Sequence, residues 1–152
     1  MLATLFPRTL DTDYRGSKIA LWLFGFVLLI KCLQSVVSIF NGHNIAMTAD
    51  GIPIDSYGPA AAQTVVALFA LLGVAKLPFY AVGWISLARY RSAVPLLLAI
   101  LALEYLARSA VLHYLPIARS SQTGGVIVNR VLFAVMLVAL WLSLRTRREP
   151  AS

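Results

Sequence analysis

The sequence of 152 residues contains little charge and almost no cysteine or histidine. Only 12% of the residues are charged, and there are 6 acidic residues, 2 histidines and 1 cysteine. A lone Cys32 excludes an intrachain disulfide and a CxxC redox pair, and two histidines in unrelated settings offer no bis-histidine haem site. The spacing of His43, Asp50 and Asp55 matches no metal-ligand pattern. We therefore expect neither a metal nor another cofactor.

Apolar residues are what the sequence has in excess. They make up 60% of the chain, whereas a soluble domain contains roughly 45 to 50%. A chain of this size cannot bury so much apolar surface in its own interior, which excludes a soluble domain. High hydrophobicity also excludes a disordered chain. The composition therefore predicts an integral membrane protein.

The apolar residues fall into runs that match the thickness of a membrane. A bilayer core of about 30 Å requires roughly 20 residues of helix. Such runs occur at residues 19–40, 60–87, 94–115 and 126–144. Helix-ending residues separate these runs: Asn41, Gly42, Pro116 and the glycines before the fourth run. The predicted fold is all-α, an integral membrane four-helix bundle that forms one domain over residues 1–152.

The basic residues predict how the chain is threaded. They gather before the first run, between the second and third, and after the fourth: Arg8, Arg15, Lys18, Arg89, Arg91, Arg145, Arg147 and Arg148. In the loops 41–59 and 116–125, the only lysine or arginine is Arg119. Because Lys and Arg are retained on the cytoplasmic side, both termini are predicted to be cytoplasmic. Trp22, Trp84 and Trp141 lie near the same ends, as interfacial aromatic residues do.

This distribution also explains the net charge of +7. In a soluble protein such an excess would indicate nucleic acid. Here it follows from topology, so no nucleic-acid partner is expected. Richness in Arg, Ala and Leu, with no N-x-Ser/Thr acceptor site, favours the inner (plasma) membrane of a bacterium.

Several ionisable residues lie inside the predicted spans and are not explained by topology. These are Lys31, Lys76, Glu104, Arg108 and Arg130. Each costs about 3 kcal/mol at the centre of a bilayer, so we expect them to face the bundle interior or a hydrated cavity. The halves of the spans nearer the cytoplasm are almost free of charge. The pattern therefore predicts a cationic cavity open toward the outer side and sealed below by an apolar plug.

Helical spacing places other polar residues beside these charges. Gln34 and Ser35 lie one turn from Lys31, and Glu104 and Arg108 are four apart and can pair along their helix. The candidate ligand-binding residues are Lys31, Gln34, Ser35, Lys76, Tyr80, Glu104, Arg108, Asn129 and Arg130.

Several interpretations of these residues remain open at this point. They could join the helices through hydrogen bonds alone, or bind an anionic lipid, an anionic small ligand or a partner helix without catalysis, the hypothesis that we favour. A second hypothesis is a transporter or channel subunit that forms homo-oligomers or joins a partner membrane subunit, with small residues such as Gly73 between protomers. A third is an enzyme acting on an isoprenoid or quinone, with Glu104 as acid or base. A lysine that loses its proton in a proton-coupled step is the fourth.

The first outer loop shows a pattern of alternating apolar residues. Ile45 and Met47 precede Asp50 and Gly51, and Ile52 and Ile54 follow them, which favours a short β-hairpin that covers the cavity. Pro53 restricts such a hairpin to an edge. An irregular loop is the alternative.

Overall fold

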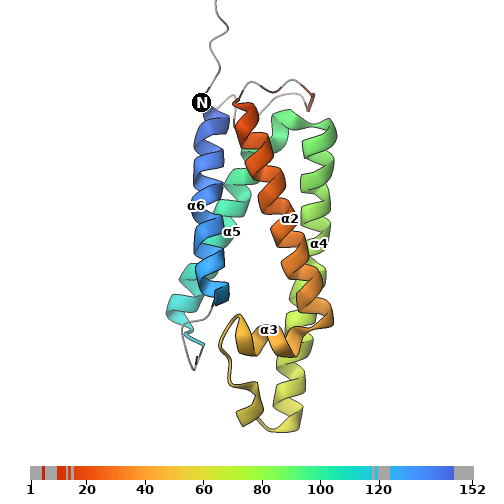
Figure 1. The fold of residues 1–152 in the computed structure, drawn as a ribbon, viewed down its shortest axis with the longest axis vertical. Helices are drawn as coiled ribbons and strands as arrows, with labels where there is room; N and C mark the ends of the chain where they lie inside the picture. Colours follow the sequence, from red (N-terminus) through yellow and green to blue (C-terminus); the bar gives the residue numbers. More distant parts are fainter. Residues whose placement is uncertain are drawn as a thin grey trace, which may run out of the picture.

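The computed structural model describes residues 5, 10–12, 14, 16–117, 119 and 124–145. Within these residues the protein is helical and contains no strand (Figure 1). The elements are α2 (Lys18–Phe40), α3 (Gly42–Thr48), η1 (Ile54–Ser56), α4 (Pro59–Arg89), η2 (Arg91–Ala93), α5 (Val94–Tyr114) and α6 (Gly124–Leu144).

The helices α2, α4, α5 and α6 are long enough and apolar enough to cross a membrane. Their bounds differ by only a few residues from the predicted spans, which confirms, over the described residues, a helical fold with four helices of the length and composition that a membrane span requires. The ends carry ordinary signals: Ser17 Oγ accepts a hydrogen bond from Ile19 N at the start of α2, and Pro59 occupies the first turn of α4. The chain is therefore a multi-pass membrane protein.

The four long helices run alternately up and down the bundle (Figure 1). The start of α2, the η2 turn and the end of α6 lie together at one end, which we call the basic end because it carries Lys18, Arg89, Arg91 and Arg145. The opposite end, which carries α3 and η1, we call the α3 end. Positive side chains thus gather as the topology argument requires, while the cytoplasmic orientation of the basic end stays a prediction. Arg8, Arg15, Arg147 and Arg148 lie outside the described residues.

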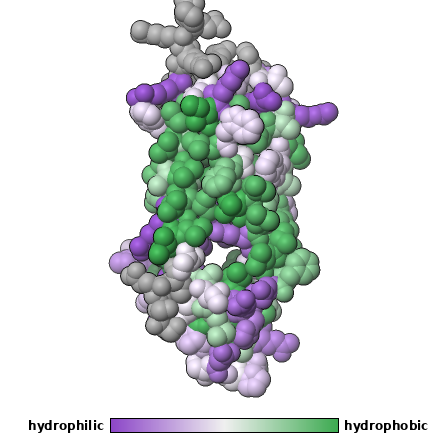
Figure 2. All heavy atoms as spheres, viewed as in Figure 1, coloured by the Kyte–Doolittle hydropathy of each residue, from purple (hydrophilic) through white to green (hydrophobic). Residues whose placement is uncertain are grey.

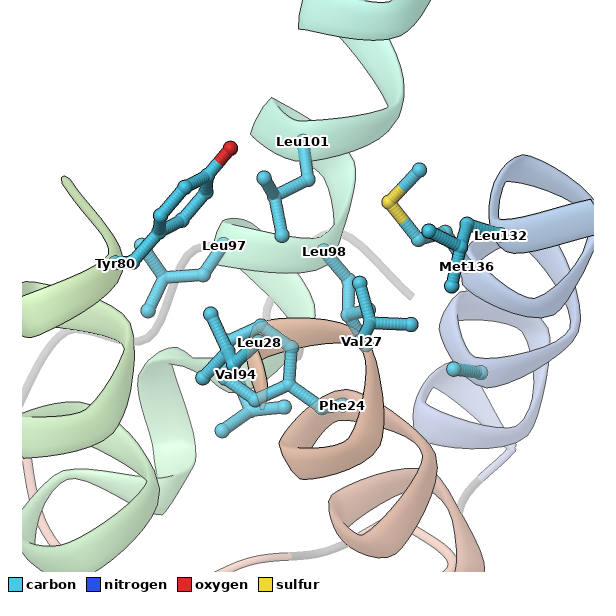
Figure 3. Close-up of a cluster of buried hydrophobic side chains, with 11 residues drawn as sticks. Phe24, Val27, Leu28, Tyr80, Val94, Leu97, Leu98, Leu101, Leu132 and Met136 are labelled. Atoms are coloured by element: carbon cyan, nitrogen blue, oxygen red, sulfur yellow. The ribbon is translucent and has the colours of Figure 1, made fainter. Parts of the chain in front are cut away.

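A core of apolar side chains from all four long helices fills the half of the bundle nearer the basic end (Figure 3). Phe24 and Leu28 of α2, Leu98 of α5 and Met136 of α6 are fully buried, and Tyr80 of α4 joins them. Since lipid tails are as apolar as these side chains, close packing rather than escape from water holds them together. This core lies in the half of the bundle where the sequence predicted an apolar plug.

Helices α2 and α4 approach each other closely at a glycine. A Cβ atom added to Gly73 would lie 2.7 Å from the backbone oxygen of Ser35. Gly73 therefore serves packing within one chain, not the contact between protomers that the transporter hypothesis assigned to it.

The predicted β-hairpin is wrong. Residues 42–48 form helix α3, in which Ile45 N bonds to Asn41 O and Ala49 N bonds to Ile45 O. The isoleucines after the turn pack with Ala46 against α4 instead of pairing across strands. The turn itself was placed correctly, because Gly51 has a φ of 70°.

Candidate functional site

The four cations inside the spans lie at one depth in the bundle. At a rise of about 1.5 Å per residue, each is roughly 20 Å from the basic end of its helix: Lys31, Lys76, Arg108 and Arg130. In a hydrocarbon core of about 30 Å this level lies in the half nearer the α3 end. Figure 2 shows a hollow between the apolar band and the α3 end, with hydrophilic residues at its edge.

Lys31 joins α2 to α6 at this level. Its side chain is 8% exposed, and Nζ donates a hydrogen bond of 2.8 Å to Asn129 Oδ1. Because an amide oxygen carries no net charge, this bond satisfies one donor but does not neutralise the ammonium group. The layer formed by the four cations therefore keeps the positive charge of Lys31.

Glu104 lies beside Lys76 rather than Arg108. Lys76 Nζ is 3.7 Å from Glu104 Oε1, so the ion pair joins α4 to α5 across the bundle. The expected pairing along α5 is replaced, and the Arg108 guanidinium lies over the ring of Tyr105, 5.7 Å from its centroid. Tyr105 in turn stacks on Phe133 of α6, with ring centroids 4.3 Å apart. These aromatic contacts hold Arg108 without neutralising it.

A pocket of about 380 Å³ opens beside this layer at the α3 end. Its charged and polar lining comprises Asp50, Arg108, Ser109, His113, Arg119, Asn129 and Arg130. In the part of the chain that the structure describes, no ion pair engages the three arginines. The pocket therefore carries three positive charges against one carboxylate.

Asp50 reaches this pocket because Ala49, the residue that follows α3, lies against the first turn of α6. A Cβ atom added to Gly125 would lie 2.5 Å from the backbone oxygen of Ala49, so only glycine allows the first turn of α6 to come so near. Burial raises the pKa of the Asp50 carboxyl above its ordinary value of 3.8, although the charges of Arg108 and Arg119 oppose this shift.

We expect Gly125→Val to move α3 away from α6 and to open the pocket wall at Asp50. The backbone oxygen of Ala49 cannot rotate away as a side chain could, so the two segments themselves must shift. Faster amide hydrogen exchange over residues 42–50 would report the change. Gly124→Val is the matched control, since nothing lies within 4 Å of a Cβ atom at Gly124. Equal exchange rates in the two variants would contradict this account of the contact.

The structure brings only some of the predicted site residues into the pocket. Arg108, Asn129 and Arg130 line it, and Lys31 is tied to it through Asn129. The others lie elsewhere. Lys76 and Glu104 form their own pair, Ser35 and Tyr80 are buried where α2 meets α4, and Gln34 is half-buried on α2.

Asp50, His113 and Arg119 line the pocket but were not among the predicted site residues. The sequence treated them as loop or interfacial residues. His113 does lie against Tyr114, edge to face at 5.8 Å, as expected of an interfacial histidine. The signal that could have identified Asp50 is a partly buried carboxylate close to several arginines. That signal is visible only once the fold of the loop is known.

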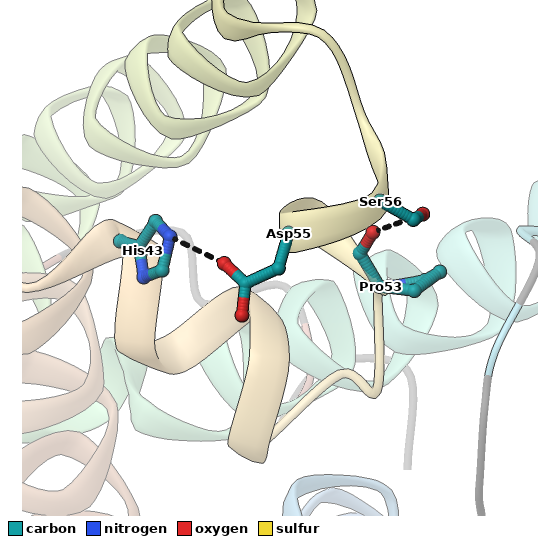
Figure 4. Close-up of polar contacts among 4 residues, drawn as sticks. All are labelled: His43, Pro53, Asp55 and Ser56. Atoms are coloured by element: carbon teal, nitrogen blue, oxygen red, sulfur yellow. Dashed lines mark hydrogen bonds and ion pairs between the residues drawn. The ribbon is translucent and has the colours of Figure 1, made fainter.

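A second polar contact lies on the outside of the α3 end (Figure 4). His43 Nε2 is 3.4 Å from Asp55 Oδ1, and both side chains are more than half exposed. Ser56 Oγ donates a hydrogen bond to the backbone oxygen of Pro53. Among the described residues no three metal-ligating side chains gather. The contact therefore ties α3 to η1.

Comparison with protein-family models, curated proteins and solved structures finds no match to this chain. What the pocket does must follow from its own groups. Guanidinium groups bind phosphate and carboxylate through paired N–H donors, and the amide and hydroxyl side chains add neutral hydrogen bonds. The arrangement is suited to holding an anion.

Proposed function

We propose that this protein is a non-enzymatic membrane protein whose pocket at the α3 end binds an anionic ligand. The ligand presents a phosphate or a carboxylate, carried by a lipid, a small molecule or a partner helix. One observation carries the proposal: Arg108, Arg119 and Arg130 surround one pocket in which Asp50 is the sole carboxylate among the lining residues.

A charged side chain near lipid is energetically costly. An arginine at the centre of a bilayer costs about 3 kcal/mol on insertion scales. Arg108 and Arg130 lie well inside their helices, and the layer behind them is already positive because Lys31 is held by a neutral amide. A bound anion would offset this charge through short, charge-assisted hydrogen bonds. The pocket also has the size of a small-ligand site.

The surrounding structure favours binding over the other hypotheses. The apolar core between the pocket and the basic end supports a closed site rather than a route through a single chain. Glu104 is paired with Lys76 and does not line the pocket, which gives no support to a role as acid or base there. We further propose that the membrane is a bacterial inner membrane and that the pocket faces away from the cytoplasm.

Mass spectrometry of anions that copurify in mild detergent tests the proposal. We expect the combined Arg108→Ala and Arg130→Ala variant to lose, by at least about tenfold, an anionic species that the wild type retains, because two charge-assisted contacts are removed. Arg145→Ala is the matched control, since Arg145 lies over the Trp141 ring at the basic end. An unchanged set of copurified anions in the double variant would overturn the proposal.

The pocket should also bind anions more tightly as the pH falls. Because the pKa of Asp50 is raised, its carboxyl takes up a proton at a higher pH than an exposed aspartate does. Protonation removes the negative charge, so affinity rises as the pH falls through that pKa. Titration with dimethyl phosphate, a diester whose single negative charge stays the same between pH 7 and pH 4, measures this, with His113→Gln as background because His113 also lines the pocket. We expect Asp50→Asn to bind more tightly at neutral pH and to lose this pH dependence; a retained dependence would contradict the assignment.

A further inference from the structure

A second, larger pocket lies on the other half of the molecule. It is a groove of about 810 Å³ between α2 and α4 at the basic end. Aromatic and aliphatic side chains make most of its wall, among them Trp22, Phe26, Leu29 and Trp84. Gly25 lines it as well, and the absence of a side chain there deepens the groove.

The groove carries its charge at one end only. Lys18 lies in the first turn of α2 and Arg91 in the η2 turn, so both line the mouth of the groove at the basic end. Arg91 Nε donates to Leu87 O, which fixes the guanidinium near the mouth while its terminal nitrogens carry further donors. No acidic residue belongs to the lining among the described residues.

The length of the groove matches one leaflet. From Lys18 to Leu29 the helix rises about 16 Å, and half of a hydrocarbon core is about 15 Å. Trp22 is 81% exposed and lies one turn below Lys18, where tryptophan side chains meet the headgroup region. The cations at the mouth suit the phosphate of an anionic phospholipid, and the apolar wall, one leaflet deep, suits its acyl chains.

We propose that this groove holds one anionic phospholipid from the leaflet at the basic end. Its phosphate lies between Lys18 and Arg91, and one acyl chain lies along Phe26 and Leu29. The site is separate from the pocket at the α3 end, because the apolar core lies between the two levels. The inference therefore does not depend on the proposed function.

Tryptophan quenching by brominated lipids tests this proposal. The chain has 3 tryptophans, so Trp141→Phe leaves the two that line the groove as reporters. The protein is reconstituted in phosphatidylcholine vesicles that contain equal small amounts of brominated phosphatidylglycerol or brominated phosphatidylcholine. Since each basic residue near an anionic lipid contributes about a fivefold gain in affinity, we expect the brominated phosphatidylglycerol to be preferred on the order of tenfold.

Matched variants separate this site from general surface charge. Lys18→Gln with Arg91→Gln should abolish the preference, while Arg145→Gln, at the same end but outside the groove lining, should retain it. Arg108→Ala with Arg130→Ala should also retain it, which distinguishes this site from the α3-end pocket. Equal quenching by the two lipids in the Trp141→Phe protein would overturn the proposal without any charge variant.

Discussion

Asn129→Leu is expected to lower the free energy of unfolding by about 3 kcal/mol, because it leaves the buried Lys31 ammonium without its hydrogen-bond acceptor. Lys31 Nζ bonds to Asn129 Oδ1 at 2.8 Å, and the lysine is 8% exposed. Leucine has the same branched heavy-atom skeleton as asparagine and fits an apolar helix face, so the loss comes from the unsatisfied charge and not from a cavity. Titration with sodium dodecyl sulfate, followed by circular dichroism, measures the change.

Replacing Lys31 by an apolar residue as well should recover most of the free energy of unfolding that Asn129→Leu loses. Lys31→Met combined with Asn129→Leu removes both polar partners, and such replacements are often neutral or stabilising. Asn44→Leu is the control, since Asn44 is exposed on α3 and should change stability by less than about 0.5 kcal/mol. If the double variant were as unstable as Asn129→Leu, the bond between α2 and α6 would not be the cause.

Gly73→Val is expected to destabilise the bundle by about 2 to 3 kcal/mol, because it forces α2 and α4 apart. A Cβ atom at Gly73 would lie 2.7 Å from the backbone oxygen of Ser35 and 2.9 Å from Ile39 Cγ1. A helix backbone cannot step aside alone, so the contact is relieved only when the whole helix moves. Because α2 and α4 also form the groove at the basic end, the same variant should weaken lipid preference there.

Gly124→Val controls for the loss of a glycine and for valine in a helix. Gly124 begins α6, and nothing lies within 4 Å of a Cβ atom there. Its stability, measured by the same detergent titration, should stay close to that of the wild type. A loss in Gly124→Val as large as in Gly73→Val would mean that the close approach to Ser35 does not set the effect, since valine is a better helix former than glycine.

The sequence predicted the long helices well because each depends on a local property. A run of about 20 apolar residues is a sufficient condition for a membrane-crossing helix, and polar or proline residues end it. Lys31, Arg108 and Arg130 were also predicted to lie near one another, since charges inside spans turn inward. The sequence placed Lys31 near the midplane and Arg108 and Arg130 in the outer half, whereas the helix bounds put all three at nearly the same distance from the basic end.

What the sequence missed depends on contacts between distant segments. Glu104 was assigned to Arg108 by spacing along one helix, yet Lys76 of α4 lies nearer once α4 and α5 are placed side by side. Asp50 reaches the pocket because the backbone of the preceding residue, Ala49, lies against Gly125 at the start of α6. The alternation of Ile45, Met47, Ile52 and Ile54 fits a hairpin, but it fits equally a short helix and a turn that pack on α4. Short apolar patterns do not distinguish these structures.

The central claim is that Arg108, Arg119 and Arg130 form a site for an anion, and an experimental structure of the protein purified in mild detergent tests it most directly. We expect non-protein density in the pocket at the α3 end, with a phosphate or carboxylate within hydrogen-bond distance of the guanidinium groups of Arg108 and Arg130. The same preparation of the Arg108→Ala and Arg130→Ala variant should lack this density while the helices keep their positions. A wild-type pocket that contains only water, with its arginines turned to the solvent, would contradict the claim.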